Sequence, residues 1–231
     1  MIERPSPNHD SRPPEQAVDL LVMHYTGMPT GAVALERLCD PAAKVSAHYL
    51  IDEDGTVYRL VDEARRAWHA GLSCWGGARD INARSIGIEL VNPGHEHGYR
   101  RFPAGQMAAL ADLCHDILDR HPIPSAGVLG HADVAPARKE DPGELFDWPA
   151  LAADGIGLYP PAIELPPADE PAELALARFG YDIEGAGLTA VATAFQRHWR
   201  PSRLDGVMDS DCRARLAWLL RAMDEAATTL C

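Results

Sequence analysis

Short apolar runs recur along the first two-thirds of the chain, and they have the length of buried strands. Residues 18–23 are mostly aliphatic and are followed at once by His24. Residues 85–91 and 128–130 have a similar character, and the second of these runs is followed by His131. Short continuous apolar runs of this kind are typical of strands that are buried on both faces of a sheet.

Two further runs and two helical patterns complete the predicted core. Residues 47–51 and 56–61 flank an Asp-Gly pair, which favours a β-hairpin because Gly accepts a positive φ at little cost. Apolar side chains at helical spacing predict helices over residues 32–39 and 104–120. Strands and helices thus alternate around a hairpin, and we expect an α/β fold with a mixed central sheet flanked by helices.

The last third of the chain has a different pattern. Five prolines between residues 158 and 171 predict a semi-stiff linker. Beyond it, helical patterns cover residues 172–179, 188–198 and 210–227. We therefore predict three parts: a catalytic domain over residues 1–157, a proline-rich linker over 158–171 and a small three-helix domain over 172–231.

Composition narrows the range of partners. The formal net charge of the 231 residues is −13, which disfavours nucleic acid and anionic membrane surfaces as partners. No run approaches the roughly 20 apolar residues that span a bilayer. The first residues lack the apolar stretch of a signal peptide, and the five cysteines are irregularly spaced. We therefore expect a cytoplasmic protein with reduced thiols, or a periplasmic one if an export signal was removed.

Three side chains suggest a metal site. His24 and His131 each follow a predicted buried strand, and such strand ends converge where an α/β sheet exposes its site. Asp141 follows ten residues after His131. Two imidazoles and one carboxylate form a three-ligand zinc site with an open position, as catalytic zinc requires. Spacing alone does not single out this set, because other histidines and acids could serve equally well.

A set of ordered motifs is more specific than the spacing. The motifs are Val22-Met23-His24-Tyr25-Thr26, Ser46-Ala47-His48-Tyr49-Leu50-Ile51, Ala67-Trp68-His69-Ala70-Gly71, Ser85-Ile86-Gly87-Ile88-Glu89, Gly130-His131-Ala132-Asp133-Val134-Ala135-Pro136, Arg138-Lys139, Asp141-Pro142-Gly143 and Phe146-Asp147-Trp148. With them the chain resembles the AmpD/AmiD family of zinc-dependent N-acetylmuramoyl-L-alanine amidases. That family shares its fold with peptidoglycan recognition proteins and a phage lysozyme. The resemblance covers roughly residues 6–159.

The resemblance implies a reaction and the residues that perform it. It implies one zinc ion per chain, held by His24, His131 and Asp141, and catalytic roles for Glu89 and Lys139. The bond cleaved would be the lactyl amide between N-acetylmuramic acid, or its 1,6-anhydro form, and the L-alanine of a stem peptide. These roles fit the chemistry, because a carboxylate can move protons between water and the leaving amine while an ammonium group stabilises a developing oxyanion.

Substrate contacts are expected from a second group of residues, which are His48, Trp68, His69, Asn82 and Arg84. An aromatic such as Trp68 could equally belong to the core, and Arg84 could pair with a stem-peptide carboxylate. The segment Asn82-Ala83-Arg84-Ser85 departs from the Asn-Asp-x-Ser that family members often carry. His95 and His97 flank Glu96, and we expect these side chains to be exposed to solvent.

The C-terminal part resembles a three-helix peptidoglycan-binding domain. The residues that carry this resemblance are Leu176, Phe179-Gly180-Tyr181, Ala190-Val191, Phe195-Gln196-Arg197 and Leu204-Asp205-Gly206-Val207. The small Gly-rich stretch usual after that last segment is replaced by Met208-Asp209-Ser210. Two roles stay open: the part binds the cell wall, or it only packs against the catalytic domain.

Three functions are compatible with these observations. The first is cytoplasmic recycling of muropeptides by an amidase, and the second is wall remodelling by an exported amidase. The third is a non-catalytic protein that binds or senses muropeptides. The presence of all three ligand residues and both catalytic residues argues against this third function. A generic zinc peptidase is disfavoured because the chain has no His-Glu-x-x-His segment. In each case the expected partner is a muropeptide, with no nucleic acid or membrane; the oligomeric state stays open.

Overall fold

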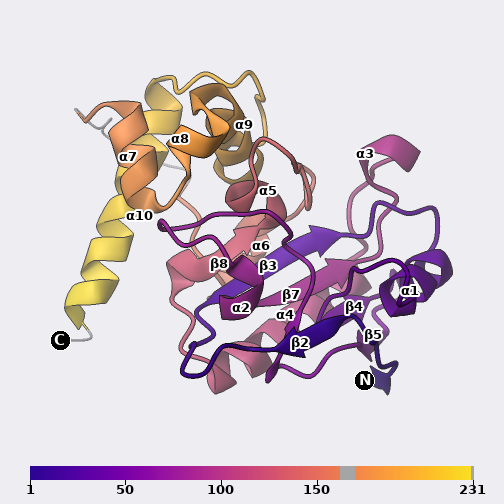
Figure 1. The fold of residues 1–231 in the computed structure, drawn as a ribbon. Helices are drawn as coiled ribbons and strands as arrows, with labels where there is room; N and C mark the ends of the chain where they lie inside the picture. The colour runs from indigo at the N-terminus through magenta and orange to yellow at the C-terminus, as the bar shows by residue number, and fades with distance from the viewer. Residues whose placement is uncertain (162–169, 230–231) are drawn as a thin grey trace.

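A mixed sheet forms the centre of the molecule, as a computed structural model shows for residues 1–161 and 170–229 (Figure 1). Its strand order is β1-β5-β4-β7-β3-β8, and only the β4–β5 pair is antiparallel. A second, two-stranded antiparallel sheet pairs β2 with β6. The strands are β1 (Ile2–Glu3), β2 (His9–Ser11), β3 (Leu20–Tyr25), β4 (Tyr49–Ile51), β5 (Val57–Arg59), β6 (Arg65–Ala67), β7 (Ser85–Leu90) and β8 (Val128–Gly130).

The predicted α/β class is confirmed, and the helices surround the sheet. Those that were predicted in the first 157 residues are α1 (Gly31–Cys39) and α4 (Ala104–Arg120). The shorter ones are α2 (Ile81–Arg84), α3 (Gly94–His97), α5 (His131–Val134) and α6 (Trp148–Ala153), with a 3₁₀ turn at Ser125–Gly127. In the C-terminal part lie α7 (Ala172–Phe179), α8 (Ile183–Ala186), α9 (Leu188–Trp199) and α10 (Ser210–Thr229).

The strand β3 is apolar along most of its length because both of its faces are covered. Leu21 and Met23 pack with α4 and α6 on one face. Leu20 and Val22 point to the other face, where they join a cluster that includes the C-terminal helices. Since side chains alternate along a strand, His24 also points to this second face. Parallel pairing places His24 of β3 beside Glu89 of β7.

The predicted hairpin is present between β4 and β5. Gly55 has a φ of 86°, the left-handed region that the turn requires, and its N–H donates to the carbonyl of Asp52. One predicted boundary differs in the neighbouring strand. We expected this strand to end at His24, the first candidate ligand, but β3 continues one residue further, to Tyr25. The reason is that the ladder with β7 continues through the His24–Glu89 and Tyr25–Leu90 pairs.

The C-terminal helices share a hydrophobic core with the sheet. Buried residues of α7, α9 and α10 belong to the same cluster as residues of β3, β8 and α5, and Figure 1 shows these helices gathered beside α5 and the β8 edge. The cluster includes Leu20, Val22, Leu129, Ala132, Leu176, Phe179, Tyr181, Phe195, Trp199 and Leu219. Most of the predicted linker lies at residues 162–169, outside the described residues, and the three-part division stays a prediction. Among the described residues no helix is long and apolar enough to cross a membrane.

One glycine of the central sheet makes room for a histidine. A Cβ at Gly87 would lie 2.5 Å from the ring atoms Cγ and Nδ1 of His69. We predict that Gly87→Ala lowers the free energy of unfolding by about 1–3 kcal/mol, because an extra methyl in a packed site forces side chains off their rotamers. Urea denaturation measures this change. In the control, Gly105→Ala, the added Cβ would find its nearest heavy atom 3.9 Å away, and we expect little change or a small gain. Equal stability of the two variants would contradict this packing.

Candidate metal centre

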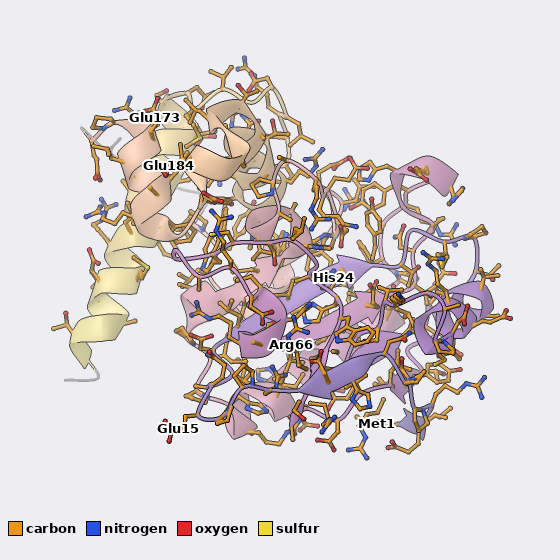
Figure 2. The ribbon with its side chains drawn as sticks, viewed as in Figure 1. Met1, Glu15, His24, Arg66, Glu173 and Glu184 are labelled. Atoms are coloured by element: carbon orange, nitrogen blue, oxygen red, sulfur yellow. The ribbon has the colours of Figure 1, made fainter. Side chains whose placement is uncertain are left out.

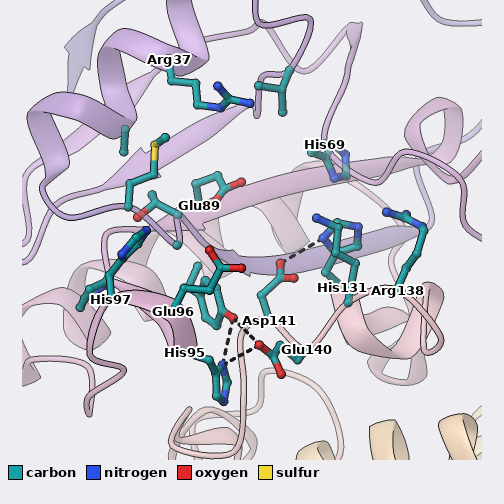
Figure 3. Close-up of a pocket in the computed structure, with 18 of the residues that line it drawn as sticks. Arg37, His69, Glu89, His95, Glu96, His97, His131, Arg138, Glu140 and Asp141 are labelled. Atoms are coloured by element: carbon teal, nitrogen blue, oxygen red, sulfur yellow. Dashed lines mark hydrogen bonds and ion pairs between the residues drawn. The ribbon is translucent and has the colours of Figure 1, made fainter.

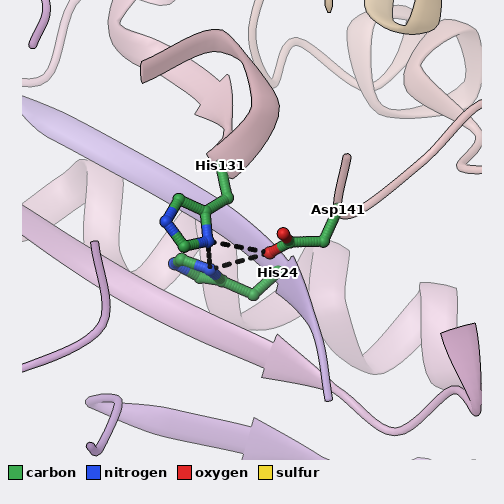
Figure 4. Close-up of side chains that lie close together, drawn as sticks. All are labelled: His24, His131 and Asp141. Atoms are coloured by element: carbon green, nitrogen blue, oxygen red, sulfur yellow. Dashed lines mark hydrogen bonds and ion pairs between the residues drawn. The ribbon is translucent and has the colours of Figure 1, made fainter. Parts of the chain in front are cut away.

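Three ligand atoms meet beside the second face of the sheet. His24 comes from β3, His131 is the first residue of α5, and Asp141 lies in the loop that follows. Nδ1 of His24 lies 3.0 Å from Nδ1 of His131, and the two nitrogens lie 3.1 and 3.0 Å from Oδ2 of Asp141 (Figure 4). All three residues are buried. Two imidazole nitrogens and one carboxylate oxygen with a fourth position left open are the donor set of catalytic zinc sites.

The outer nitrogens of the two histidines determine their tautomers. Nε2 of His131 lies 3.0 Å from the carbonyl oxygen of Ala70, so this nitrogen carries the proton and donates. Nε2 of His24 lies 3.0 Å from Nδ1 of His69, whose own Nε2 lies 3.1 Å from the hydroxyl oxygen of Ser85. That hydroxyl donates to the carbonyl of Ile81 at 2.7 Å. Since the Ser85 hydroxyl donates to Ile81, it accepts from Nε2 of His69, and Nδ1 of His69 in turn accepts from Nε2 of His24. The Nε2 atoms of both histidines therefore carry protons.

The direction of these bonds tests whether a cation fits the site. With both Nε2 atoms protonated, each Nδ1 presents a lone pair towards the other and towards the carboxylate. Burial, reinforced by His131, lowers the pKa of His24 to about 4, so this imidazole is neutral at pH 7. Three acceptors in contact with no proton between them repel one another unless a cation lies among them. The donor set and its protonation therefore fit a divalent metal ion of the zinc type.

A carboxylate without a partner lies beside the three ligands. Glu89 is buried, and its Oε2 has no hydrogen-bond partner among the described residues. Burial, with a smaller effect from the charge of Asp141, raises the pKa of Glu89 well above its usual value, whereas Lys139 acts in the opposite direction. A carboxylate with a free oxygen and a raised pKa is suited to accepting and returning a proton.

Glu89 and Lys139 line the same cavity as His131 and Asp141. The cavity has a volume of about 810 Å³ and is open to solvent. Figure 3 shows Glu89, His131 and Asp141 among the side chains that line it. Its wall contains four cationic side chains and four acidic ones, which are Arg37, Arg138, Lys139, Arg197, Glu89, Glu96, Glu140 and Asp141. A cavity of this size with mixed charge can accommodate a zwitterionic or acidic ligand of several residues.

Of the five predicted substrate-contacting residues, only His69 lines this cavity. Its ring also backs His24, so its geometry is that of a residue that orients a metal ligand. His48 is buried between strands, where its Nδ1 accepts the N–H of Gly87. Asn82 accepts the N–H groups of His69 and Ala70 through its Oδ1. These contacts keep the segment around His69 in place.

The other two residues have partners away from the cavity. The indole N–H of Trp68 donates to Asp10, 3.2 Å away. Arg84 forms an ion pair with Asp19, with Nε 2.7 Å from its Oδ1. The pairing of Arg84 with a stem-peptide carboxylate thus has no support in the geometry, because Asp19 already occupies the guanidinium group.

Several polar residues near the site were not anticipated from the sequence. The expected exposure is found for His97 but is wrong for His95, which is partly buried. Nδ1 of His95 lies 2.9 Å from the hydroxyl oxygen of Tyr25, and its Nε2 lies 3.2 Å from Glu144. His198, Arg197 and Asp133 also pack around the ligand segment. Asp133 belongs to the Gly-His-Ala-Asp motif and Arg197 to the Phe-Gln-Arg segment, and those were the available signals; nothing local marks His198.

Comparison with known proteins identifies relatives of this site. A family model described as N-acetylmuramoyl-L-alanine amidase matches residues 14–144. N-acetylmuramoyl-L-alanine amidase AmiD of Escherichia coli is 36% identical over 246 residues, which covers 93% of this chain and 88% of the relative. The 1,6-anhydro-N-acetylmuramyl-L-alanine amidase AmpD of the same species is 36% identical over 161 residues, which covers 62% of this chain and 86% of the relative.

Solved structures agree with these sequence matches. The complex of Escherichia coli AmiD with the substrate anhydro-N-acetylmuramic acid-L-Ala-D-γ-Glu-L-Lys superimposes with a TM-score of 0.79 at 37% identity, covering 89% of each chain. AmpDh3 from Pseudomonas aeruginosa superimposes with a TM-score of 0.78 at 31% identity, covering 90% of this chain and 92% of that one. The family model spans more than half of the chain, and AmiD aligns over 93% of it, so the chain belongs to the N-acetylmuramoyl-L-alanine amidase family.

Proposed function

We propose that the protein hydrolyses the lactyl amide between N-acetylmuramic acid, or its 1,6-anhydro form, and the L-alanine of a muropeptide, with one zinc ion at His24, His131 and Asp141. The observation that carries this proposal is the contact of three acceptor atoms about 3 Å apart, beside a cavity in which Glu89 has a free oxygen. The relative AmiD, crystallised with an anhydro-muramoyl tripeptide, supports the choice of substrate.

The residues of the chain account for the proton movements of this reaction. When bound, zinc would supply a Lewis acid that lowers the pKa of a coordinated water and polarises an amide carbonyl. Glu89 takes a proton from the attacking water through its free oxygen. It then returns that proton to the nitrogen of L-alanine as the C–N bond breaks. The new lactyl carboxylic acid then loses its proton to the released amine, so the products are an ammonium group on the peptide and a carboxylate on the lactyl group.

Lys139 and the cavity wall stabilise charge during the same reaction. Lys139 lies two residues before Asp141 in the loop, and both side chains reach the cavity. Its ammonium group can therefore stabilise the negative charge that develops on the amide oxygen, a contact typically worth about 3–4 kcal/mol. A non-catalytic muropeptide-binding protein would need neither this cation nor a buried carboxylate without a partner.

We further propose that the enzyme acts on soluble muropeptides in the cytoplasm. The support comes from the cysteines. Cys74, Cys114 and Cys212 are buried free thiols, and Cys39 is a partly buried one. Free thiols are typical of reducing compartments, since in an oxidising one they are prone to mispairing. The alternative is an exported amidase that remodels the wall, and the two roles differ in substrate.

The first prediction concerns the metal. His131→Ala should reduce the zinc content of purified protein from one ion per chain and weaken zinc binding by more than the roughly 10–100-fold that loss of an outer-sphere partner costs. Metal analysis and competition with a chelator measure this. His115→Ala is the control. His115 pairs with Asp154 on the exposed surface, so this variant should keep its zinc. Full zinc and full activity in His131→Ala would show that the ligand assignment is wrong.

The second prediction separates catalysis from metal binding. Glu89→Gln should keep zinc bound but lower kcat by about 10²–10⁴-fold, because an amide of the same shape cannot accept the proton. Lys139→Ala should also keep zinc and lower kcat. The control is Glu36→Gln, which changes an exposed carboxylate on α1. Steady-state kinetics with a purified muropeptide measure the effect, and a Glu89→Gln enzyme with near-normal kcat excludes the proposed role.

The third prediction concerns the physical form of the substrate. The intact protein should release peptide from soluble anhydro-muropeptides much faster than from sacculi. Mass spectrometry of the products, at equal concentrations of cleavable bonds, compares the two rates. Digestion of sacculi at the same rate would favour wall remodelling over recycling. The intact chain is needed because removal of the C-terminal helices would expose Leu20, Val22 and Leu129 of the shared core.

A further inference from the structure

The carboxylate of Asp133 is buried between the sheet domain and the C-terminal helices. Asp133 is 1% exposed, and three groups donate hydrogen bonds to it. One is local: the N–H of Gly130, 2.7 Å from Oδ2. The other two donors come from the C-terminal part. They are the hydroxyl of Tyr181, 2.7 Å from Oδ1, and Nδ1 of His198, 2.8 Å from Oδ2. A buried carboxylate needs such donors, because it has lost its hydration.

Asp133 is linked through the backbone to two of the metal ligands. It is the third residue of α5, the helix that begins at His131. Its bond to Gly130 closes the first turn of α5 and thereby sets the direction in which His131 leaves the strand. Ala132 lies between His131 and Asp133, and its N–H donates to the backbone carbonyl of Asp141 at 2.9 Å. A shift of this turn therefore moves both ligands.

A second contact from α9 reaches the same segment from the other side. Arg197 lines the cavity, and its Nη2 lies 3.3 Å from Oε2 of Glu140, the residue between Lys139 and Asp141. The other oxygen of Glu140 lies 3.3 Å from Nδ1 of His95. Arg197 thus binds the loop at the point where a catalytic residue and a metal ligand adjoin.

The packing of α9 gives these contacts a rigid base. The ring of His198 is stacked between Trp148 and Trp199, with ring centroids 3.7 and 3.6 Å away. Trp148 belongs to α6 and Trp199 to α9, so the stack joins the two parts of the chain. Burial lowers the pKa of His198, which keeps it a neutral donor towards Asp133 at pH 7.

We propose that the C-terminal helices are a positioning element for the metal centre: Tyr181 and His198 hold the turn of His131 through Asp133, and Arg197 holds the loop of Asp141 through Glu140. The inference rests on the proposed zinc site. It differs from a role in wall binding, because the contacts point towards the ligand segment. It also differs from simple packing. The C-terminal part contributes polar side chains that bind residues adjacent to the ligands, in addition to the apolar side chains of the shared core.

The test removes one of these bonds without removing packing. Tyr181→Phe keeps the ring that contacts Trp75, Phe179 and Trp199, but leaves Oδ1 of Asp133 without its donor. The matched control is Tyr159→Phe, since Tyr159 packs against the same cluster. Zinc affinity is measured by competition with a chelator, and kcat and KM with a soluble muropeptide. We expect Tyr181→Phe to bind zinc about tenfold more weakly and to lose kcat with little change in KM.

A measurement on metal-free protein separates this inference from the proposed function. Amide hydrogen exchange should show faster exchange at Gly130 and Ala132 in Tyr181→Phe, beyond any change in global stability. If the wild type binds no zinc, the proposed function fails, while local loosening of these amides still supports the positioning role. Arg197→Gln is a second variant, for which we expect weaker zinc binding as well.

Two outcomes would contradict the positioning role of the C-terminal helices. If Tyr181→Phe and Arg197→Gln match Tyr159→Phe in zinc affinity, kcat and amide exchange, the C-terminal helices only pack and the inference is wrong. A merely structural role predicts that stability falls while zinc affinity of the folded protein and the ratio of kcat to KM stay unchanged. That pattern too would overturn the positioning role.

Discussion

Two imidazole nitrogens and a carboxylate oxygen that lie about 3 Å apart in a buried place need surroundings that fix their protons, and when their lone pairs face one another they favour a cation among them. Much of the structure meets this requirement. Ser85 and His69 fix the proton of His24, and the carbonyl of Ala70 fixes that of His131. Gly87 is small so that His69 can lie against β7. The site thus depends on residues such as Ser85, Ala70 and Gly87, which do not line the cavity.

The sheet separates stability from chemistry through the alternation of its side chains. Leu21 and Met23 of β3 pack on the α4 face, in a cluster that contains no residue of the site. On the other face the same strand passes from Leu20 and Val22, which belong to the cluster shared with the C-terminal helices, to His24 of the candidate metal centre. Position along one strand face therefore decides whether a residue serves packing or chemistry.

The sequence predicted the elements whose pattern is local. β3, β7, β8 and α4 were found because continuous apolar runs and helical spacing are strong signals. The short strands β2 and β6 were missed, since each has three residues and is largely polar. The three ligands were named through the family resemblance, as spacing alone left alternatives open. Arg84 was expected at the substrate because a cation can pair with a stem-peptide carboxylate; its ion pair with Asp19, 65 residues away, leaves no local pattern in the sequence. The same holds for His95 and His198, whose partners lie 49 and 65 residues away.

The spacing of the site along the chain has a consequence for synthesis on the ribosome. His24 and Asp141 are separated by 117 residues along the chain. Asp133 and His198 are separated by a further 65 residues. Contacts this distant form late, because loop closure must precede them. During vectorial synthesis the three ligands emerge before the helices that surround Asp133, so a nascent chain passes through a stage with ligands present but their support missing. If the proposed positioning role holds, full metal retention is acquired only once the C-terminal helices have docked.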